Sequence, residues 1–301
     1  MVSPVDTSGT DTFLRVAEYW QYDAKAKSLS LVSRYSPNHP RELGAPRDSA
    51  IPIGSGLIGR CALLNAPVLT EGLPFNSDHP EQTAPTKRTV TLAIPWKANH
   101  GERGVLALFF AHFLERPSGG VEVWSRTGGS HKLGLLNAFH GIAEDFRRMS
   151  SLLFFEMGEG LPGRVVQHLS PEALKIAENT REFLRAVAAE TSGFVEAVGF
   201  PVAAKSKAAV VLLGHREQPL AQQTAVWKMT KNGAFERCVE TETETQKPPS
   251  VDLTPHLLNA AHSGAPVLFK VEKAPSTDSY GGLVLPFLSN DGITSLCTLT
   301  W

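Results

Sequence analysis

One pattern occurs three times along this chain of 301 residues, and it limits the possible folds more than any other feature. Alternating segments that end in tryptophan occur at Val16–Trp20, Gly120–Trp124 and Thr224–Trp227, so the tryptophans stand 104 and 103 residues apart. The glycine motif Gly54-Ser-Gly-Leu-Ile-Gly59-Arg returns as Gly158-Glu-Gly-Leu-Pro-Gly163-Arg, again 104 residues later. A period of about 100 residues is too long for a solenoid repeat. It indicates duplicated domains, each with its own core.

The third copy is shorter and lacks the glycine motif, but it keeps the opening strand, the segment Ser263–Leu268 and a closing pair of apolar segments. Polar and turn-forming residues interrupt the apolar runs near Glu115–Gly119 and near Arg216–Pro219. We therefore expect a first domain at residues 1–115, a second at 116–218 and a degenerate third at 219–301.

Within each copy, short turns join the apolar segments, which predicts an antiparallel sheet. The composition of Ala173–Ala189 predicts a helix with an apolar face. Helices that flank each central sheet would place the chain in the α+β class.

Charge and cysteine content exclude several classes of protein. Twenty-nine basic and thirty acidic residues give a net charge of −1, so no broad field is directed at nucleic acid or an anionic membrane. Cys61, Cys238 and Cys297 form no CxxC pair, which argues against a disulfide framework and a cysteine-ligated zinc ion. The beginning of the chain lacks the pattern of a secretory signal, and the apolar stretches are too short to span a membrane. We expect a cytoplasmic protein with no nucleic-acid and no membrane partner.

The segment Gly54–Gly59 matches the dinucleotide fingerprint GxGxxG. A Rossmann unit also needs a buried strand before the glycines and a long crossover helix after them. Here Ala50–Ile53 contains a proline, and only about seven residues of helix fit before Pro67. The glycines instead predict a turn with positive φ that leads into a short helix.

No catalytic constellation is evident in the sequence. Ser55 does not stand in a GxSxG elbow, and the ten histidines form no HExxH arrangement, so we expect neither a catalytic residue nor a metal. Cys61 follows the glycine motif and is expected to be a small core residue rather than a reactive thiol. The cofactor stays unknown.

The motifs, taken in order, resemble a GAF domain. The glycine motif, a short helix, Ala-Pro-Val-Leu and two closing strands match this family through Ile53–Phe110 and again through Phe155–Leu213, and the third copy resembles a degenerate half. The resemblance implies a central antiparallel sheet with helices on one side and a pocket under variable loops on the other. It also implies ligands such as cyclic nucleotides or tetrapyrroles, or a role in dimer contacts.

On this resemblance, the variable segment before the closing strands lines the pocket, where an aromatic ring and a cation would hold a planar anionic ligand. The competing interpretation is a solvated loop in the first copy and a packing helix in the second. The candidate ligand-binding residues are Phe75, Asp78, His79, Arg88, Trp96, Arg181 and Phe183.

Three functional hypotheses follow from the sequence. The first is a non-catalytic sensor or regulatory protein in signal transduction, built from tandem GAF domains and acting on a separate partner protein. The second is an interaction or dimerisation module, forming a homodimer for instance, whose pockets are closed by its own side chains. The third, ranked last, is an enzyme on the GAF scaffold of the methionine sulfoxide reductase kind, with Cys61 as the thiol to test.

Overall fold

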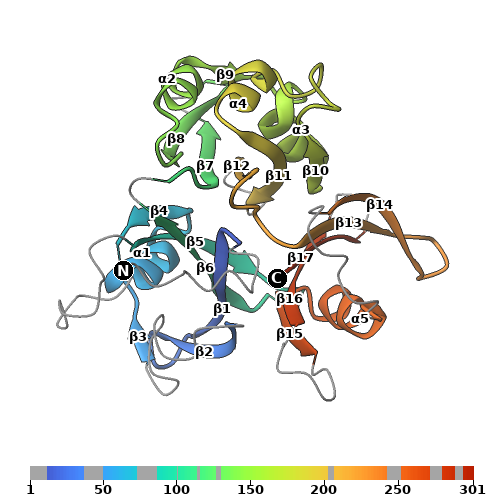
Figure 1. The fold of residues 1–301 in the computed structure, drawn as a ribbon. Coiled ribbons are helices and arrows are strands. Elements are labelled where there is room, and N and C mark those ends of the chain that lie inside the picture. The colour runs from blue at the N-terminus through green and yellow to red at the C-terminus, as the bar shows by residue number, and fades with distance from the viewer. Residues whose placement is uncertain are drawn as a thin grey trace, which may run out of the picture.

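The computed structural model describes residues 12–36, 50–72, 87–99, 101–113, 116–126, 130–202, 207–242, 252–271, 280–288 and 294–301. They form three antiparallel sheets that follow one another along the chain (Figure 1). We call each sheet with its helices a unit.

The described part of the first unit contains helix α1 (Gly56–Leu64) and a sheet of order β3-β2-β1-β6-β5-β4. Its strands are β1 (Leu14–Asp23), β2 (Ser28–Tyr35), β3 (Ala50–Pro52), β4 (Val68–Glu71), β5 (Lys87–Lys97) and β6 (Arg103–Phe113). The second unit repeats this order as β9-β8-β7-β12-β11-β10. Its elements are β7 (Gly120–Arg126), β8 (Leu133–Phe139), α2 (Glu144–Leu152), β9 (Phe154–Phe155), α3 (Gly160–His168), β10 (Glu172–Lys175), α4 (Ala186–Thr191), β11 (Phe194–Val202) and β12 (Ala208–His215).

The third unit has the corresponding order β14-β13-β17-β16-β15, without a counterpart of the edge strands β3 and β9 among the described residues. Its elements are β13 (Gln223–Met229), β14 (Phe235–Glu242), α5 (Thr254–Ser263), β15 (Val267–Val271), β16 (Tyr280–Leu288) and β17 (Thr294–Thr300). In all three units, a shift of strand register comes directly before the repeated tryptophan, at Trp20, Trp124 and Trp227.

The two glycine turns have the same geometry. The N–H of Gly54 donates to the Gly59 carbonyl at 2.9 Å, and the N–H of Gly158 donates to the Gly163 carbonyl at 3.0 Å. Gly54 and Gly158 have φ of 86° and 87°, a region that glycine enters without the steric cost of a Cβ atom. The predicted turn with positive φ, leading into a short helix, is therefore present in both units.

Each sheet buries its two faces against different partners. On β6, Val105, Ala107 and Phe109 face α1, whereas the alternate residues face the other two sheets. The faces opposite the helices pack together, so that all three sheets share one core. Its aromatic contacts include Phe13 with Phe110 at 4.8 Å and Tyr35 with Trp301 at 5.2 Å. The units thus have separate cores on their helical sides and a common core between them.

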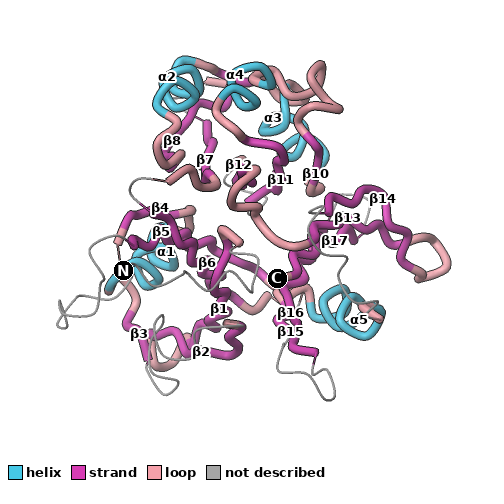
Figure 2. Tube along the Cα trace, in the orientation of Figure 1, coloured by secondary structure: helices cyan, strands magenta, loops and turns pink. Residues whose placement is uncertain are grey.

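The expected α+β architecture of helix-flanked sheets is wrong. Strands hold 51% of the structure and helices 19%, and the sheets are curled half-barrels (Figure 2). The predicted helix at Ala173–Ala189 begins instead as strand β10, where Leu174 pairs with Ala197, and only α4 is helical at its end. The other sheets cover one face of each sheet, so helices are left with the second face alone. No helix in these ranges has the length and apolar character needed to cross a membrane.

Candidate functional site

Of the seven residues that the sequence offered as ligand-binding candidates, the structure describes the side chains of three, Trp96, Arg181 and Phe183. Phe75, Asp78 and His79 lie outside the described residues. Arg88 belongs to β5, but its side chain is not described. The half-buried Trp96, near the end of the same strand, donates its indole N–H to the Gly264 carbonyl of the third unit at 2.8 Å. Trp96 therefore joins two units.

In the second unit, Arg181 is exposed and Phe183 is fully buried. The Phe183 ring packs against the guanidinium of Arg185, 5.0 Å from the ring centre. Phe183 is part of the core of the second unit.

Beneath this contact lies a buried charge cluster that sequence reasoning missed. Glu122, on β7, accepts hydrogen bonds from Arg185 Nη2 at 2.8 Å and from Trp124 Nε1 at 2.9 Å, and its Oε1 lies 2.8 Å from His140 Nε2. Four aromatic rings surround the guanidinium at 4.9 to 5.8 Å, from Trp124, Phe146, Phe155 and Phe183. Burial alone would raise the pKa of Glu122, but Arg185 and His140 outweigh it and hold the pKa far below its usual range.

The first unit has a simpler version of this cluster. Glu18 accepts from Trp20 Nε1 at 2.9 Å and from Arg34 Nε at 2.6 Å, and Arg34 stands opposite it on β2. Here burial outweighs the pairing with Arg34 and raises the pKa of Glu18. In the second unit, Ala138 occupies the position opposite Glu122, and the cation comes from Arg185 instead. The recurring Glu-x-Trp in an otherwise apolar strand was the signal that could have revealed both glutamates.

The three cysteines differ in their exposure to reagents. Cys61 is packed in the core of the first unit, as predicted, and burial raises the pKa of its thiol strongly. Cys297 is also buried, and burial raises the pKa of its thiol to about 12. Cys238 is exposed on the edge strand β14. Because the thiolate is the reactive form of cysteine, Cys61 and Cys297 are inert where they lie.

Cys238 lines a groove of about 560 Å³ where β10 of the second unit lies against β14 of the third. The hydroxyls of Ser170 and Ser295 meet across the same junction at 3.0 Å. Basic and acidic side chains both contribute to the walls, from His168, Lys175, Lys228, Glu172, Glu178, Glu182 and Glu240. The groove therefore places an accessible thiol beside basic and acidic side chains.

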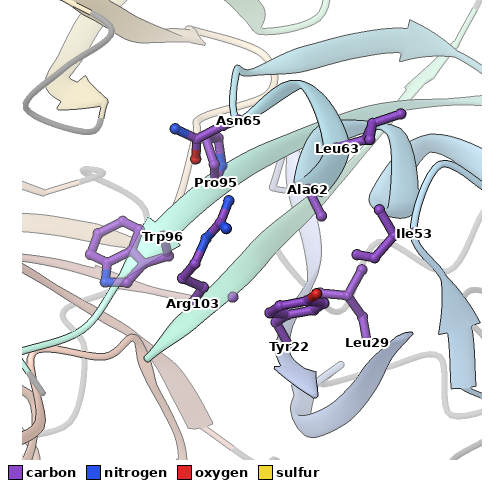
Figure 3. Close-up of a pocket in the computed structure, with 10 residues that line it drawn as sticks. Tyr22, Leu29, Ile53, Ala62, Leu63, Asn65, Pro95, Trp96 and Arg103 are labelled. Atoms are coloured by element: carbon purple, nitrogen blue, oxygen red, sulfur yellow. The ribbon is translucent and has the colours of Figure 1, made fainter. Parts of the chain in front are cut away.

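A second, smaller pocket of about 170 Å³ lies in the first unit (Figure 3). Arg103 extends between Trp96 and Tyr22, with its guanidinium 5.9 Å from the centre of the Tyr22 ring. The described residues that line this pocket include no carboxylate, histidine or cysteine, and Cys61 faces the core instead. Within the described ranges, no cluster of three or more histidine, cysteine, aspartate or glutamate side chains is placed to hold a metal ion.

Comparison with known proteins gives matches among solved structures. No family model matches the chain, and no curated protein matches it. One similar solved structure is the free methionine-R-sulfoxide reductase from Neisseria meningitidis in complex with its substrate, at 17% identity and a TM-score of 0.24. The match covers 34% of this chain and 56% of the reductase. Another is fRMsr of Staphylococcus aureus in its reduced form, at 19% identity and a TM-score of 0.22. This match covers 32% of this chain and 54% of that structure. This chain therefore spans just over half the length of either structure.

A likeness at this level assigns no activity and locates no site. The first of these structures is named as an enzyme in complex with its substrate, whereas the sequence predicted a non-catalytic protein. The expectation of a non-catalytic protein, whether a sensor in signal transduction or an interaction module, is corrected on this finding.

Proposed function

We propose that this protein is a thiol-dependent reductase of a small sulfoxide, with Cys238 as the reacting thiol. The observation that carries the proposal is the position of Cys238, which is the exposed cysteine of the three and lines the groove between β10 and β14. The Cys61 thiol, which the sequence offered for this chemistry, is buried among apolar side chains.

The walls of the groove suit a substrate of amino-acid type. Lys175 and Lys228 complement a carboxylate, and Glu178 and Glu182 complement an ammonium group. The exposed apolar side chain of Val239, in the same groove, would pack against the thioether arm. A free sulfoxide amino acid has these three chemical features.

The chemistry needs one cysteine and an external thiol. The Cys238 sulfur takes the oxygen atom of the sulfoxide, which leaves as a thioether, and Cys238 becomes a sulfenic acid. A molecule of external thiol condenses with the sulfenic acid, releasing water and forming a mixed disulfide. A second external thiol then displaces Cys238 as a free thiol and departs as the external disulfide. Two thiols are oxidised for each sulfoxide reduced.

The test is the formation of methionine from free methionine sulfoxide, with dithiothreitol as the external thiol. The expected result is turnover by the wild-type chain and by Cys61→Ala and Cys297→Ala, the matched controls for buried thiols. Cys238→Ser is expected to lose turnover while keeping the fold. An inactive wild-type chain, or an active Cys238→Ser variant, contradicts the proposal.

Two expectations accompany this proposal. A cytoplasmic location supplies the reducing thiols that the cycle consumes. The relation to tandem GAF domains is supported by the common strand order and by the matching glycine turns. The separate partner protein and the cyclic nucleotide or tetrapyrrole ligand stay predictions from the resemblance.

A further inference from the structure

The pocket of about 170 Å³ in the first unit has a charged side and an apolar side. Figure 3 shows Arg103 on one side of it, with Ile53 and Ala62 opposite and Tyr22 between them. Arg103 is exposed, whereas the other three side chains are half-buried and pack against the core of this unit. A ligand from solvent can therefore reach both the cation and the apolar wall.

The strand register explains why Arg103 lies on this side of the sheet. Successive residues of a strand point to opposite faces, and β6 pairs with β5 along its whole length without a shift of register. Arg103 thus shares the face of Val105 and Ala107, which α1 covers. Its guanidinium lies 5.9 Å from the centre of the Tyr22 ring, and this contact keeps the cation at the pocket.

The charge of Arg103 is not balanced by any described residue of the pocket wall, since none of them is a carboxylate. Lys97 is the direct partner of Arg103 on β5, and like charges in opposite positions of a sheet repel each other. The adjacent Glu102 accepts from Gln21 Nε2 at 3.0 Å. Gln21 alternates with Tyr22 along β1 and so lies on the other face of the sheet. An anion at the pocket would relieve the repulsion between the two cations.

The size and donors of the pocket define the anion further. An apolar cavity of about 150 Å³ holds a benzene molecule, so a pocket of about 170 Å³ has room for one six-membered ring. The planar fork of a guanidinium donates two parallel hydrogen bonds to a carboxylate. Asn65, which ends α1 at the same pocket and is exposed, brings a further donor in its side-chain amide. These features match a flat ring that bears a carboxylate.

We propose that this pocket binds a small aromatic carboxylate. The carboxylate accepts hydrogen bonds from Arg103, and the ring packs against Ile53 and Ala62. The inference goes beyond the proposed reductase and does not depend on it, because the pocket contains no cysteine and shares no residue with the groove of Cys238.

The experiment uses sodium benzoate as the probe. Benzamide is the neutral analogue of the same shape, and sodium acetate is a carboxylate without the ring. Binding to the full chain is measured by ligand-detected NMR titration at constant ionic strength. The expected result is saturable binding of benzoate, with roughly tenfold weaker binding of benzamide, which lacks the charge, and of acetate, which lacks the apolar surface.

Arg103→Gln changes an exposed side chain and should weaken benzoate binding roughly tenfold, because a charge-assisted hydrogen bond is lost. Arg237→Gln is the matched control. Arg237 is also exposed and lies over an aromatic ring, that of Trp227 at 5.7 Å, but it belongs to the third unit and pairs with Glu240. This control should bind benzoate as the wild type does.

The proposal is overturned by a lack of saturable benzoate binding, by equal binding of benzamide, by wild-type affinity in Arg103→Gln, or by an equal loss in Arg237→Gln. Cys238→Ser leaves this pocket unchanged and should bind benzoate as the wild type does. Loss of sulfoxide turnover in Cys238→Ser together with retained benzoate binding therefore separates the two proposals.

Discussion

Arg185 and Glu122 stand 63 residues apart in the sequence and form an ion pair in the interior of the second unit, with Nη2 and Oε2 2.8 Å apart. Arg185 precedes α4, and Glu122 lies on the central strand β7. The pair therefore fastens the segment before α4 onto the sheet. In the first unit, Arg34 balances the corresponding Glu18 from the neighbouring strand.

Replacing Arg185 by methionine should destabilise the chain by about 3–5 kcal/mol, because it leaves the buried carboxylate of Glu122 without its cation. Urea unfolding measures this free energy. The double variant Glu122→Gln/Arg185→Met should recover part of the loss, since no buried charge is then left unpaired. Arg34→Met is the matched control and should cost less, because the Arg34 side chain is 19% exposed. An equal loss in both single variants would refute this explanation.

Glu196 should give the free energy of unfolding a pH dependence of opposite sign to that from Glu122. It accepts from the Leu220 N–H and the Thr241 hydroxyl, both at 3.0 Å, and burial raises its pKa. A raised folded-state pKa gives stability that is complete below the unfolded pKa and is lost as pH rises through the folded value. Each unit of raised pKa corresponds to about 1.4 kcal/mol.

Glu196→Gln should therefore stabilise the chain at neutral pH and change little below about pH 4, where the wild-type carboxyl is protonated in both states. Unfolding free energies measured from acidic to neutral pH check this. For Glu122, whose pKa is lowered, the contribution is present above the unfolded pKa and declines as pH falls toward the folded value. A Glu196→Gln gain that does not grow with pH would contradict the assignment.

Gly59→Ala and Gly163→Ala should each destabilise the chain, by about 1–3 kcal/mol or more. A Cβ atom on Gly59 would lie 2.3 Å from the Pro52 carbonyl oxygen, and one on Gly163 would lie 2.0 Å from that of Glu156. Thermal unfolding measures the loss. Gly233→Ala is the control. Its φ of 76° would strain an alanine, but nothing lies within 4 Å of the added Cβ atom. A larger loss of stability in Gly233→Ala would show that backbone strain, rather than steric contact of the Cβ atom, sets the cost of these substitutions.

Trp96→Phe should loosen the contact between the first and third units. The variant removes the 2.8 Å hydrogen bond to Gly264, at the end of α5, at a cost of about 0.5–1.5 kcal/mol, and keeps an aromatic ring against Phe287. Amide hydrogen exchange in α5 is expected to accelerate. Trp20→Phe is the control, since that tryptophan donates within the first unit, to Glu18 at 2.9 Å. Equal acceleration by both variants would argue against a contact between units.

Short-range features of this molecule could be predicted from its residues. Positive φ at Gly54 and Gly158 was predicted correctly, since the constraint is local and depends on the absence of a side chain. The burial of Cys61 followed from its place on an apolar helix. The recurring tryptophans marked strands that occupy corresponding places in the three sheets.

Long-range features became visible only in the folded structure. Helical composition at 173–189 gave way to strand β10, because pairing with the edge of β11 outweighs local propensity. The apolar closing strands did not reveal that other sheets would cover one face of β6. The partner of Glu122 was hidden for the same reason. Ion pairs form between groups that folding brings together, and no local rule connects position 122 with position 185.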